Sequence, residues 1–148
     1  MSRHAAHTAA PPDVVWRLLA RPEHWPDWSP HVRGAWGLAG PDGWVREGAR
    51  GAARLLGVVP VPARITAVEE GRSWTWRVGV VDMEHRVERD PGGGCTVAVT
   101  LSAPGAVQAV VAAAYAPVVA LMMRNLARVG DDVVAARGGQ PKKTSAVA

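Results

Sequence analysis

The chain has 148 residues, of which 48% are hydrophobic and 20% are charged, a composition typical of one soluble domain with a buried core. Its net charge of +4 comes from scattered basic residues, not from a basic helix or basic-aromatic strand, which argues against a nucleic-acid partner. A single cysteine excludes an intrachain disulfide and a zinc site with several thiolates. The histidines lack zinc-like spacing, so we expect no metal and no cofactor. No apolar signal-peptide run opens the chain, and we expect a cytoplasmic protein.

The first predicted elements are a strand over residues 2–9 and a short amphipathic helix that ends before Arg21. Pro12 suits the first turn of that helix, because the missing N–H would have no partner there. Asp13 favours the positive end of the helix dipole. The chain is therefore predicted to begin with a strand followed by a helix.

The segment 23–30 is predicted to form a second helix of about one turn, because prolines limit its length. Trp25 and Trp28 are three residues apart and can share one face of that turn. They either close one end of a sheet or border the mouth of a ligand site.

Six further strands are expected after this helix, with short turns between them, and strands at this spacing pair antiparallel. Their predicted ranges are 31–38, 47–56, 63–70, 73–79, 81–89 and 95–101. Residues 57–62 are predicted to be a turn or bulge. The clearest alternation of apolar and charged residues lies in 81–89, and it places His85 in the middle of an apolar face.

A long helix is predicted from Pro104 to Arg137, because apolar residues recur there at steps of three and four. The residues placed on its apolar face are Val107, Val110, Val111, Ala114, Val118, Leu121, Met122, Asn125, Leu126, Val129 and Val133. Before Met123 the opposite face is also apolar, whereas charged residues follow it. We therefore expect the first half to be covered on most sides and the second half to lie on a surface.

A membrane span is the alternative interpretation of Ala106–Met123, which has 18 residues and is near the lower length limit for a span. The segment contains a central proline and lacks an aromatic belt. Burial against a sheet is therefore favoured, and no stable membrane insertion is expected.

The predicted fold is α+β, with a seven-stranded curved antiparallel sheet wrapped around a long C-terminal helix and two short helices after strand 1. Residues 1–137 should form this domain, and 138–148 a disordered tail. A strongly curved sheet and a helix cannot meet everywhere. An apolar cavity of about a few hundred Å³ is therefore expected between them.

Four motifs resemble those of one superfamily. They are A-P-P-D-V-V-W at 10–16, W-P-D-W-S-P at 25–30, E-G-R-S-W-T-W at 70–76, and His85 followed by G-G-C-T-V at 93–97. The chain resembles the START-like helix-grip superfamily (SRPBCC), which includes polyketide cyclase/dehydrase and lipid-transport proteins. The resemblance extends over about residues 8–136. It implies the helix-grip fold and leaves the activity open, because the superfamily includes enzymes, receptors and carriers.

His85 and Arg64 are the predicted catalytic residues. A histidine titrates near neutral pH and can act as a general acid or base, and its burial should depress its pKa. The alternative is a structural histidine in the core. An inward-facing arginine could hold a carbonyl, enolate or carboxylate oxygen. Cys95 is expected to be a small core residue, not a nucleophile.

The predicted ligand-binding residues combine flat apolar walls with a few polar groups. They are Trp28, Trp36, Arg50, Arg54, Trp74, Trp76, Met83, Tyr115, Met122 and Asn125.

Three functions fit these observations. The first is a polyketide cyclase-like enzyme that binds a hydrophobic small molecule and controls the conformation of a reactive chain. The second is a non-catalytic carrier or sensor of lipid or aromatic metabolites. The third, favoured only by the basic charge, is a toxin–antitoxin or other partner-binding module. The protein is expected to be a monomer or homodimer, and the sequence does not choose between the first two functions.

Overall fold

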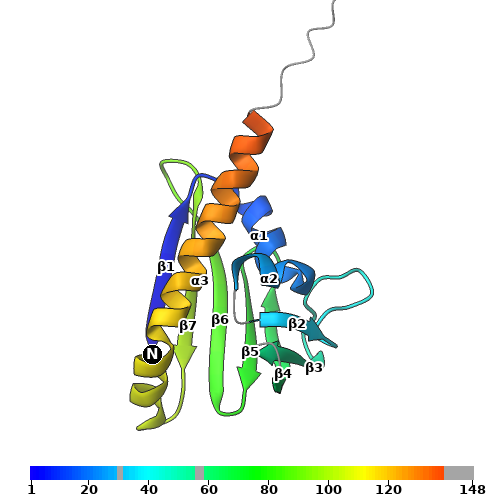
Figure 1. Ribbon diagram of the computed structural model, residues 1–148, viewed down its shortest axis with the longest axis vertical. Helices are drawn as coiled ribbons and strands as arrows, with labels where there is room; N and C mark the ends of the chain where they lie inside the picture. Colours follow the sequence, from blue (N-terminus) through cyan, green and yellow to red (C-terminus); the bar gives the residue numbers. More distant parts are fainter. Residues whose placement is uncertain (30–31, 56–58, 139–148) are drawn as a thin grey trace, which may run out of the picture.

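One antiparallel sheet with a long helix across one face forms the body of the protein (Figure 1). The computed structural model describes residues 1–29, 32–55 and 59–138. In chain order the elements are β1 (Ser2–Thr8), α1 (Pro12–Ala20), η1 (Pro22–His24), α2 (Trp25–Trp28), β2 (Val32–Trp36), β3 (Arg50–Leu55), β4 (Val59–Glu69), β5 (Ser73–Val78), β6 (Val81–Arg89), β7 (Cys95–Ser102) and α3 (Val107–Gly138).

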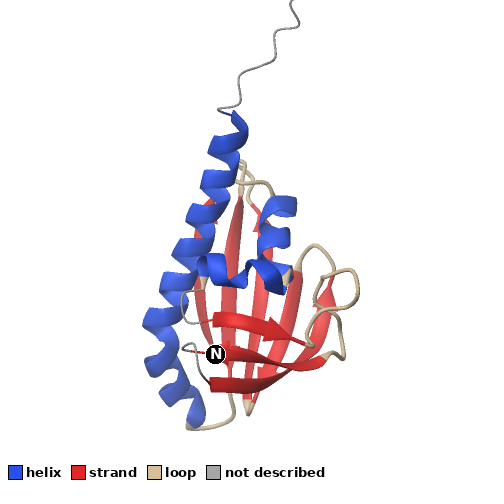
Figure 2. Cartoon of the chain, turned by 45° about the vertical axis from the view of Figure 1, so that its right-hand side comes forward, coloured by secondary structure: helices blue, strands red, loops and turns tan. Residues whose placement is uncertain are grey.

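The seven strands lie in the order β1-β7-β6-β5-β4-β3-β2, and every neighbouring pair is antiparallel. The N-terminal strand β1 thus pairs with β7, the last strand before α3. The helices α1, α2 and α3 cover the same face of the curved sheet (Figure 2). The predicted α+β helix-grip fold is confirmed.

The strand β4 begins earlier than predicted, so the expected turn over 57–62 is wrong for residues 59–62. Pro60 and Pro62 lie in this first part of the strand. That part pairs with β3 only, since pairing with β5 starts at Arg64. A proline has no N–H to donate, so it is tolerated where one side of the strand has no neighbouring strand to bond. The remaining predicted turn residues, 57–58, and the predicted tail beyond Gly138 lie outside the described residues.

The helix α3 is present as predicted and continues through Pro117, but its buried side differs from the prediction. Val110 is 68% exposed and Leu121 is 40% exposed, although both were placed on the buried face. Val119 and Met123, which were not placed there, are 3% and 0% exposed.

The prediction that the first half of α3 is covered on most sides and the second half lies on a surface is also wrong. Of the first ten residues of α3 only Val111 is buried, whereas Met123, Leu126, Ala127 and Gly130 are buried in the second half. The second half packs closely against the end of β1. A Cβ atom on Gly130 would come within 2.9 Å of the Thr8 hydroxyl oxygen.

A carboxylate fixes this crossing of α3 and β1. Asp131 Oδ1 accepts hydrogen bonds of 2.8 Å from both the Thr8 hydroxyl and the Ala9 backbone N–H. By length and composition α3 could cross a membrane, and 22% of its most apolar 18-residue window is buried. In this fold the helix packs on the sheet through its second half and leaves an apolar strip of its first half exposed.

The observed helix orientation predicts different costs for two neighbouring substitutions. Met123→Ala should lower the free energy of unfolding by about 2–5 kcal/mol, because it leaves a cavity in the core. Leu121→Ala should lower it by less than about 1 kcal/mol, because that side chain is partly in water. Urea denaturation of both variants measures the two values. Equal losses would contradict the orientation.

Candidate functional site

Three tryptophan side chains fasten the short helices to the sheet. The indole N–H groups of Trp25 and Trp74 both donate to the backbone carbonyl of Leu19, at 2.9 and 3.0 Å. The indole N–H of Trp28 donates to the carbonyl of Leu18 at 2.9 Å. These carbonyls belong to the last turn of α1, where helix geometry leaves them without an intrahelical partner. The W-P-D-W turn and β5 are therefore fixed against α1.

The same tryptophans build a stack of rings that ends on His85. Trp25 stacks on Trp74 with ring centroids 5.2 Å apart, and Trp74 stacks on His85 at 3.8 Å. Trp74 and His85 are direct cross-strand partners on β5 and β6, which places their side chains face to face. Trp76 meets all three rings edge-on, at centroid distances of 5.4, 5.8 and 6.0 Å.

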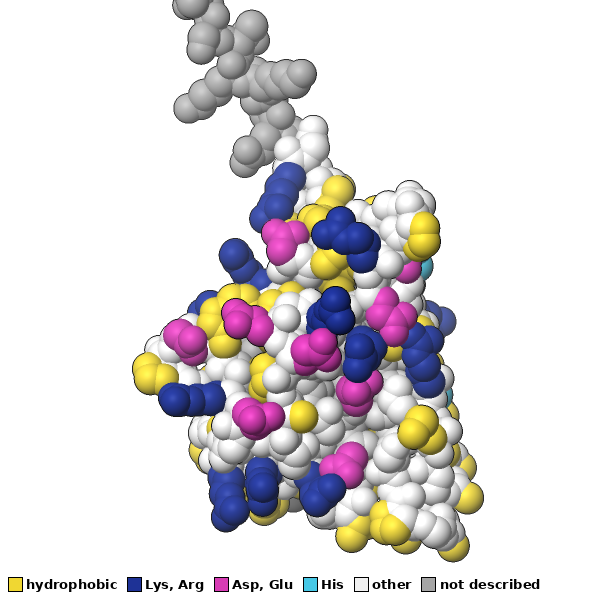
Figure 3. Space-filling view, turned by 180° about the vertical axis from the view of Figure 1, so that it is seen from behind, with side chains coloured by type: hydrophobic (Ala, Val, Ile, Leu, Met, Phe, Trp, Pro, Cys, Tyr) yellow, Lys and Arg dark blue, Asp and Glu magenta, His cyan; other side chains and the backbone are white. Residues whose placement is uncertain are grey.

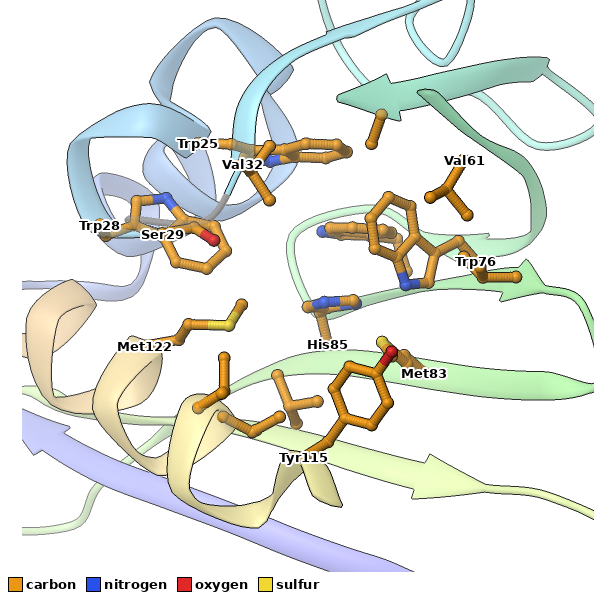
Figure 4. Close-up of a pocket in the computed structure, with 16 residues that line it drawn as sticks. Trp25, Trp28, Ser29, Val32, Val61, Trp76, Met83, His85, Tyr115 and Met122 are labelled. Carbon is orange, nitrogen blue, oxygen red and sulfur yellow. The ribbon is translucent and has the colours of Figure 1, made fainter. Parts of the chain in front are cut away.

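An apolar pocket lies between this ring cluster, α2 and α3 (Figure 4). Its lining residues are Trp25, Trp28, Ser29, Val32, Ala53, Val61, Trp74, Trp76, Val78, Met83, His85, Val99, Tyr115, Val118, Val119 and Met122. The free volume is about 60 Å³. The predicted volume of a few hundred Å³ is therefore wrong for this conformation, because large side chains fill most of the space between sheet and helix.

His85 is 3% exposed, and burial lowers its pKa from 6.5 to about 3. The predicted direction of the pKa shift is confirmed, since desolvation disfavours the charged imidazolium. The imidazole is therefore neutral at physiological pH. In Figure 4 the imidazole faces the pocket beside Trp76 and Met83.

Two ring nitrogens of the pocket are buried without a hydrogen-bond partner among the described residues. They are Nδ1 of His85 and Nε1 of Trp76. Trp76 is 8% exposed. A buried polar atom left without a partner costs about 1–3 kcal/mol. Such atoms in a pocket wall are suited to a ligand that supplies the missing partner.

Seven of the predicted site residues line the pocket, and five do not. Trp28, Trp74, Trp76, Met83, His85, Tyr115 and Met122 come together there, and their functional roles stay predictions. Tyr115 is 40% exposed and stands at the rim.

The expectation that Arg50, Arg54 and Arg64 face the ligand is wrong. All three are exposed. Ala53 lines the pocket, so strand alternation turns its neighbour Arg54 to the opposite face of the sheet. Cross-strand pairing of Arg50 with Arg64 places both on that outer face.

Trp36 and Asn125 also lie away from the pocket, so their predicted ligand contacts are wrong for this structure. Trp36 is 49% exposed and is paired with Ala52, which alternation places on the outer face of β3. The side chain of Asn125 accepts a hydrogen bond from Arg128 at 3.5 Å, on the exposed side of α3.

The sequence reasoning missed Trp25 and Ser29 as pocket residues. Both belong to the proline-flanked W-P-D-W-S segment. Trp25 was predicted either to close one end of the sheet or to border a ligand mouth, and it was not named among the ligand-binding residues. Two tryptophans three residues apart on one helical turn were the available signal, because one inward face presents both rings. The missed Val61 lies in the part of β4 that was predicted to be a turn.

Cys95 is a core residue, as predicted, since it is fully buried and its thiol donates to the Ala10 carbonyl at 3.4 Å. Burial raises the pKa of the thiol to about 11, so the reactive thiolate is not formed near neutral pH. Within residues 1–29, 32–55 and 59–138, no group of three or more His, Cys, Asp and Glu side chains could hold a metal ion.

Comparison with known proteins agrees with the architecture. The sequence profile of the family described as polyketide cyclase / dehydrase and lipid transport matches residues 2–131. No curated protein matches the chain significantly.

Solved structures of the same shape include a protein from Mesorhizobium loti, with a TM-score of 0.70 and 15% identity over 88% of this chain and 96% of its own. XoxI from Bacillus cereus has a TM-score of 0.68 and 12% identity, over 90% and 96% of the two chains. A START superfamily protein from Mycobacterium smegmatis has a TM-score of 0.63 and 15% identity, over 86% and 97%. At these identities the likeness shows the fold alone.

The buried state of His85 predicts a pH dependence of stability. As the pH falls below 6.5, His85 of the unfolded chain takes up a proton. In the folded chain its pKa of about 3 keeps His85 neutral until the pH is much lower. Between these values the free energy of unfolding should fall by about 1.4 kcal/mol per pH unit. Above pH 6.5 both states are neutral at this site and the contribution is constant.

Urea denaturation of the wild type and His85→Gln between about pH 7 and about pH 4 isolates the contribution of His85 to the free energy of unfolding. The wild type should lose stability relative to the variant as the pH falls. A difference between the two proteins that does not change with pH would mean that His85 takes up its proton normally in the folded state.

Proposed function

Since the chain belongs to the polyketide cyclase / dehydrase and lipid transport family, whose fold binds hydrophobic ligands, we propose that it carries or senses one small, largely apolar molecule. The ligand is planar and presents a hydrogen-bond acceptor. It occupies the space between the ring cluster and α3. The observation that supports this proposal is that two nitrogens in a mostly apolar pocket, His85 Nδ1 and Trp76 Nε1, have no hydrogen-bond partner among the described residues.

The shape of the walls favours a flat ligand. Trp25, Trp74 and His85 are nearly parallel, with interplanar angles of 11° and 9°, and Trp76 stands almost perpendicular to them. An aromatic or conjugated ring can continue such an arrangement by stacking or by edge-to-face contact. The indole N–H of Trp76 can only donate, so it requires an acceptor such as a carbonyl oxygen.

Ligand entry requires the pocket to expand beyond its free volume of about 60 Å³. Met83 and Met122 are the adaptable parts of the wall, because methionine has three rotatable side-chain bonds and repacks easily. Tyr115, at the exposed rim on α3, can turn outward into solvent. Binding through side-chain rearrangement leaves the sheet and the helix in place.

Carriage is favoured over proton-transfer catalysis by the pKa of His85. A general base is most effective when its pKa lies near the working pH. With a pKa of about 3, the imidazole is a weak base and is never the acid at neutral pH. The arginines that could have held an enolate lie on the other face of the sheet.

A polyketide cyclase-like activity is the second candidate, and the two unpartnered nitrogens also favour it. An indole N–H and the N–H of a neutral imidazole can stabilise an oxygen that gains negative charge, without transferring a proton. The rings would meanwhile hold a reactive chain in a folded conformation. This activity needs one N–H from each ring to point at the same substrate oxygen.

The polar contact can be tested with a pair of matched probes, naphthalene and 2-acetylnaphthalene, which differ by one carbonyl group. Trp76→Phe keeps a ring but removes the N–H. It should weaken 2-acetylnaphthalene binding about 3- to 10-fold, the value of one hydrogen bond, and leave naphthalene binding within about twofold. Isothermal titration calorimetry measures both affinities.

Trp36→Phe, on the outer face, is the matched control and should alter neither affinity. If Trp76→Phe weakens the binding of both probes equally, the role of this residue is packing alone. Failure of both probes to bind the wild type would remove the basis of the proposal.

Carrier and enzyme are separated by incubating the protein with a reactive poly-β-ketone. As a carrier, it should leave the rate of cyclisation at the buffer value, and His85→Gln should change affinity only. A rate acceleration that His85→Gln lowers by about 10²-fold or more would establish catalysis and overturn the carrier assignment. Circular dichroism of the variant confirms that it folds.

A further inference from the structure

Three arginines form a row across the outer face of the sheet, opposite to the face that α1, α2 and α3 cover (Figure 2). Arg50 of β3 is the direct cross-strand partner of Arg64 of β4, and Arg64 is the direct partner of Arg77 of β5. Neighbouring strands are about 4.8 Å apart, so the row spans about 10 Å between its outer Cα atoms. Figure 3 shows cationic side chains side by side at the lower left of this face.

Most of the charge in this row is not neutralised. Arg77 pairs with Asp82 of β6, to whose two carboxylate oxygens it donates hydrogen bonds of 2.8 Å each. Arg50 and Arg64 have no ion pair with any described residue, and both are exposed. Like charges placed directly opposite each other on a sheet are destabilising. Folding alone therefore does not account for the row, and an anion between the guanidinium groups would remove the repulsion.

A shallow hollow, widely open to solvent, lies beside the row and can admit such an anion. It has a volume of about 350 Å³ and is lined by Arg50, Gly51, Pro62, Ala63, Arg64 and Arg77. The other members of the lining are small or rigid, so the three guanidinium groups supply all of its charge. The hollow is open to solvent, and a large or membrane-bound anion could reach it.

We propose that this row, Arg50, Arg64 and Arg77, is a binding site for a phosphate-bearing anion. Guanidinium groups match phosphate oxygens with two parallel hydrogen bonds, and arginine is the preferred residue for such recognition. A row about 10 Å long suits a ligand with more than one phosphate group. The site is independent of the pocket, which lies on the opposite face of the same strands.

The test uses two phosphate probes with the full chain: tripolyphosphate in solution, and phosphatidylcholine vesicles that contain phosphatidylinositol bisphosphate. The double variant Arg50→Gln/Arg64→Gln should bind at least one probe about tenfold more weakly than the wild type, because it removes both unpaired guanidinium groups. Binding to tripolyphosphate alone would indicate a soluble ligand. Binding to the vesicles alone, beyond that to phosphatidylserine vesicles of equal charge, would indicate a lipid headgroup.

The control variant Arg124→Gln/Arg128→Gln removes the same charge from the exposed side of α3 and should bind within about twofold of the wild type. Equal weakening in both double variants would show attraction by net charge and overturn the site, as would failure of both probes to bind the wild type. A single-stranded oligonucleotide that binds while neither probe does would reassign the face to nucleic acid.

Thermal melting gives a second measurement that does not need a ligand. Arg64→Gln removes the central charge of the row and should leave the Tm unchanged or higher, because it relieves repulsion on both sides. A clear fall in Tm would show that Arg64 supports the fold, which would contradict a row kept for binding.

Discussion

The carbonyl of Leu19 is the point on which the arrangement of the site depends. It accepts two indole N–H groups, one from the short helix α2 and one from the centre of the sheet. A carbonyl in the last turn of a helix is free to do this, because no later N–H of that helix reaches it. The shared acceptor brings Trp25 and Trp74 into parallel contact, and their stack then sets where His85 and the pocket lie.

This arrangement divides the pocket tryptophans into two kinds. Trp25, Trp28 and Trp74 each donate their N–H to a backbone carbonyl of α1, so they serve structure first. Trp76 does not, and its nitrogen stays unpartnered within the described part of the chain. His85 combines both roles, because the stack that fixes its ring also removes it from water and keeps it neutral.

The fold could be predicted because alternation in 81–89 and the four local motifs agree with one another, and so could the inward position of His85. The orientation of α3 could not, since nearly every residue of Ala106–Met123 is apolar and the sequence gives no preferred face. The outward direction of Arg50 and Arg54 was also ambiguous, because small residues that could face either way separate them. The pocket volume depends on side-chain packing, which periodicity does not encode.

The strands β4 and β5 can carry a repulsive row on one face because the other face more than offsets its cost. Each directly opposed pair of like charges costs about 0.2–1 kcal/mol. Ile65 follows Arg64 in β4, and Trp76 precedes Arg77 in β5. Alternation therefore points both side chains inward, where Ile65 is 0% and Trp76 is 8% exposed. Burying each such side chain contributes about 1.5–3 kcal/mol. The free energy gained by burying the inner side chains therefore exceeds the cost of the repulsion on the outer face. The sheet can keep charges that serve binding and do not stabilise the fold.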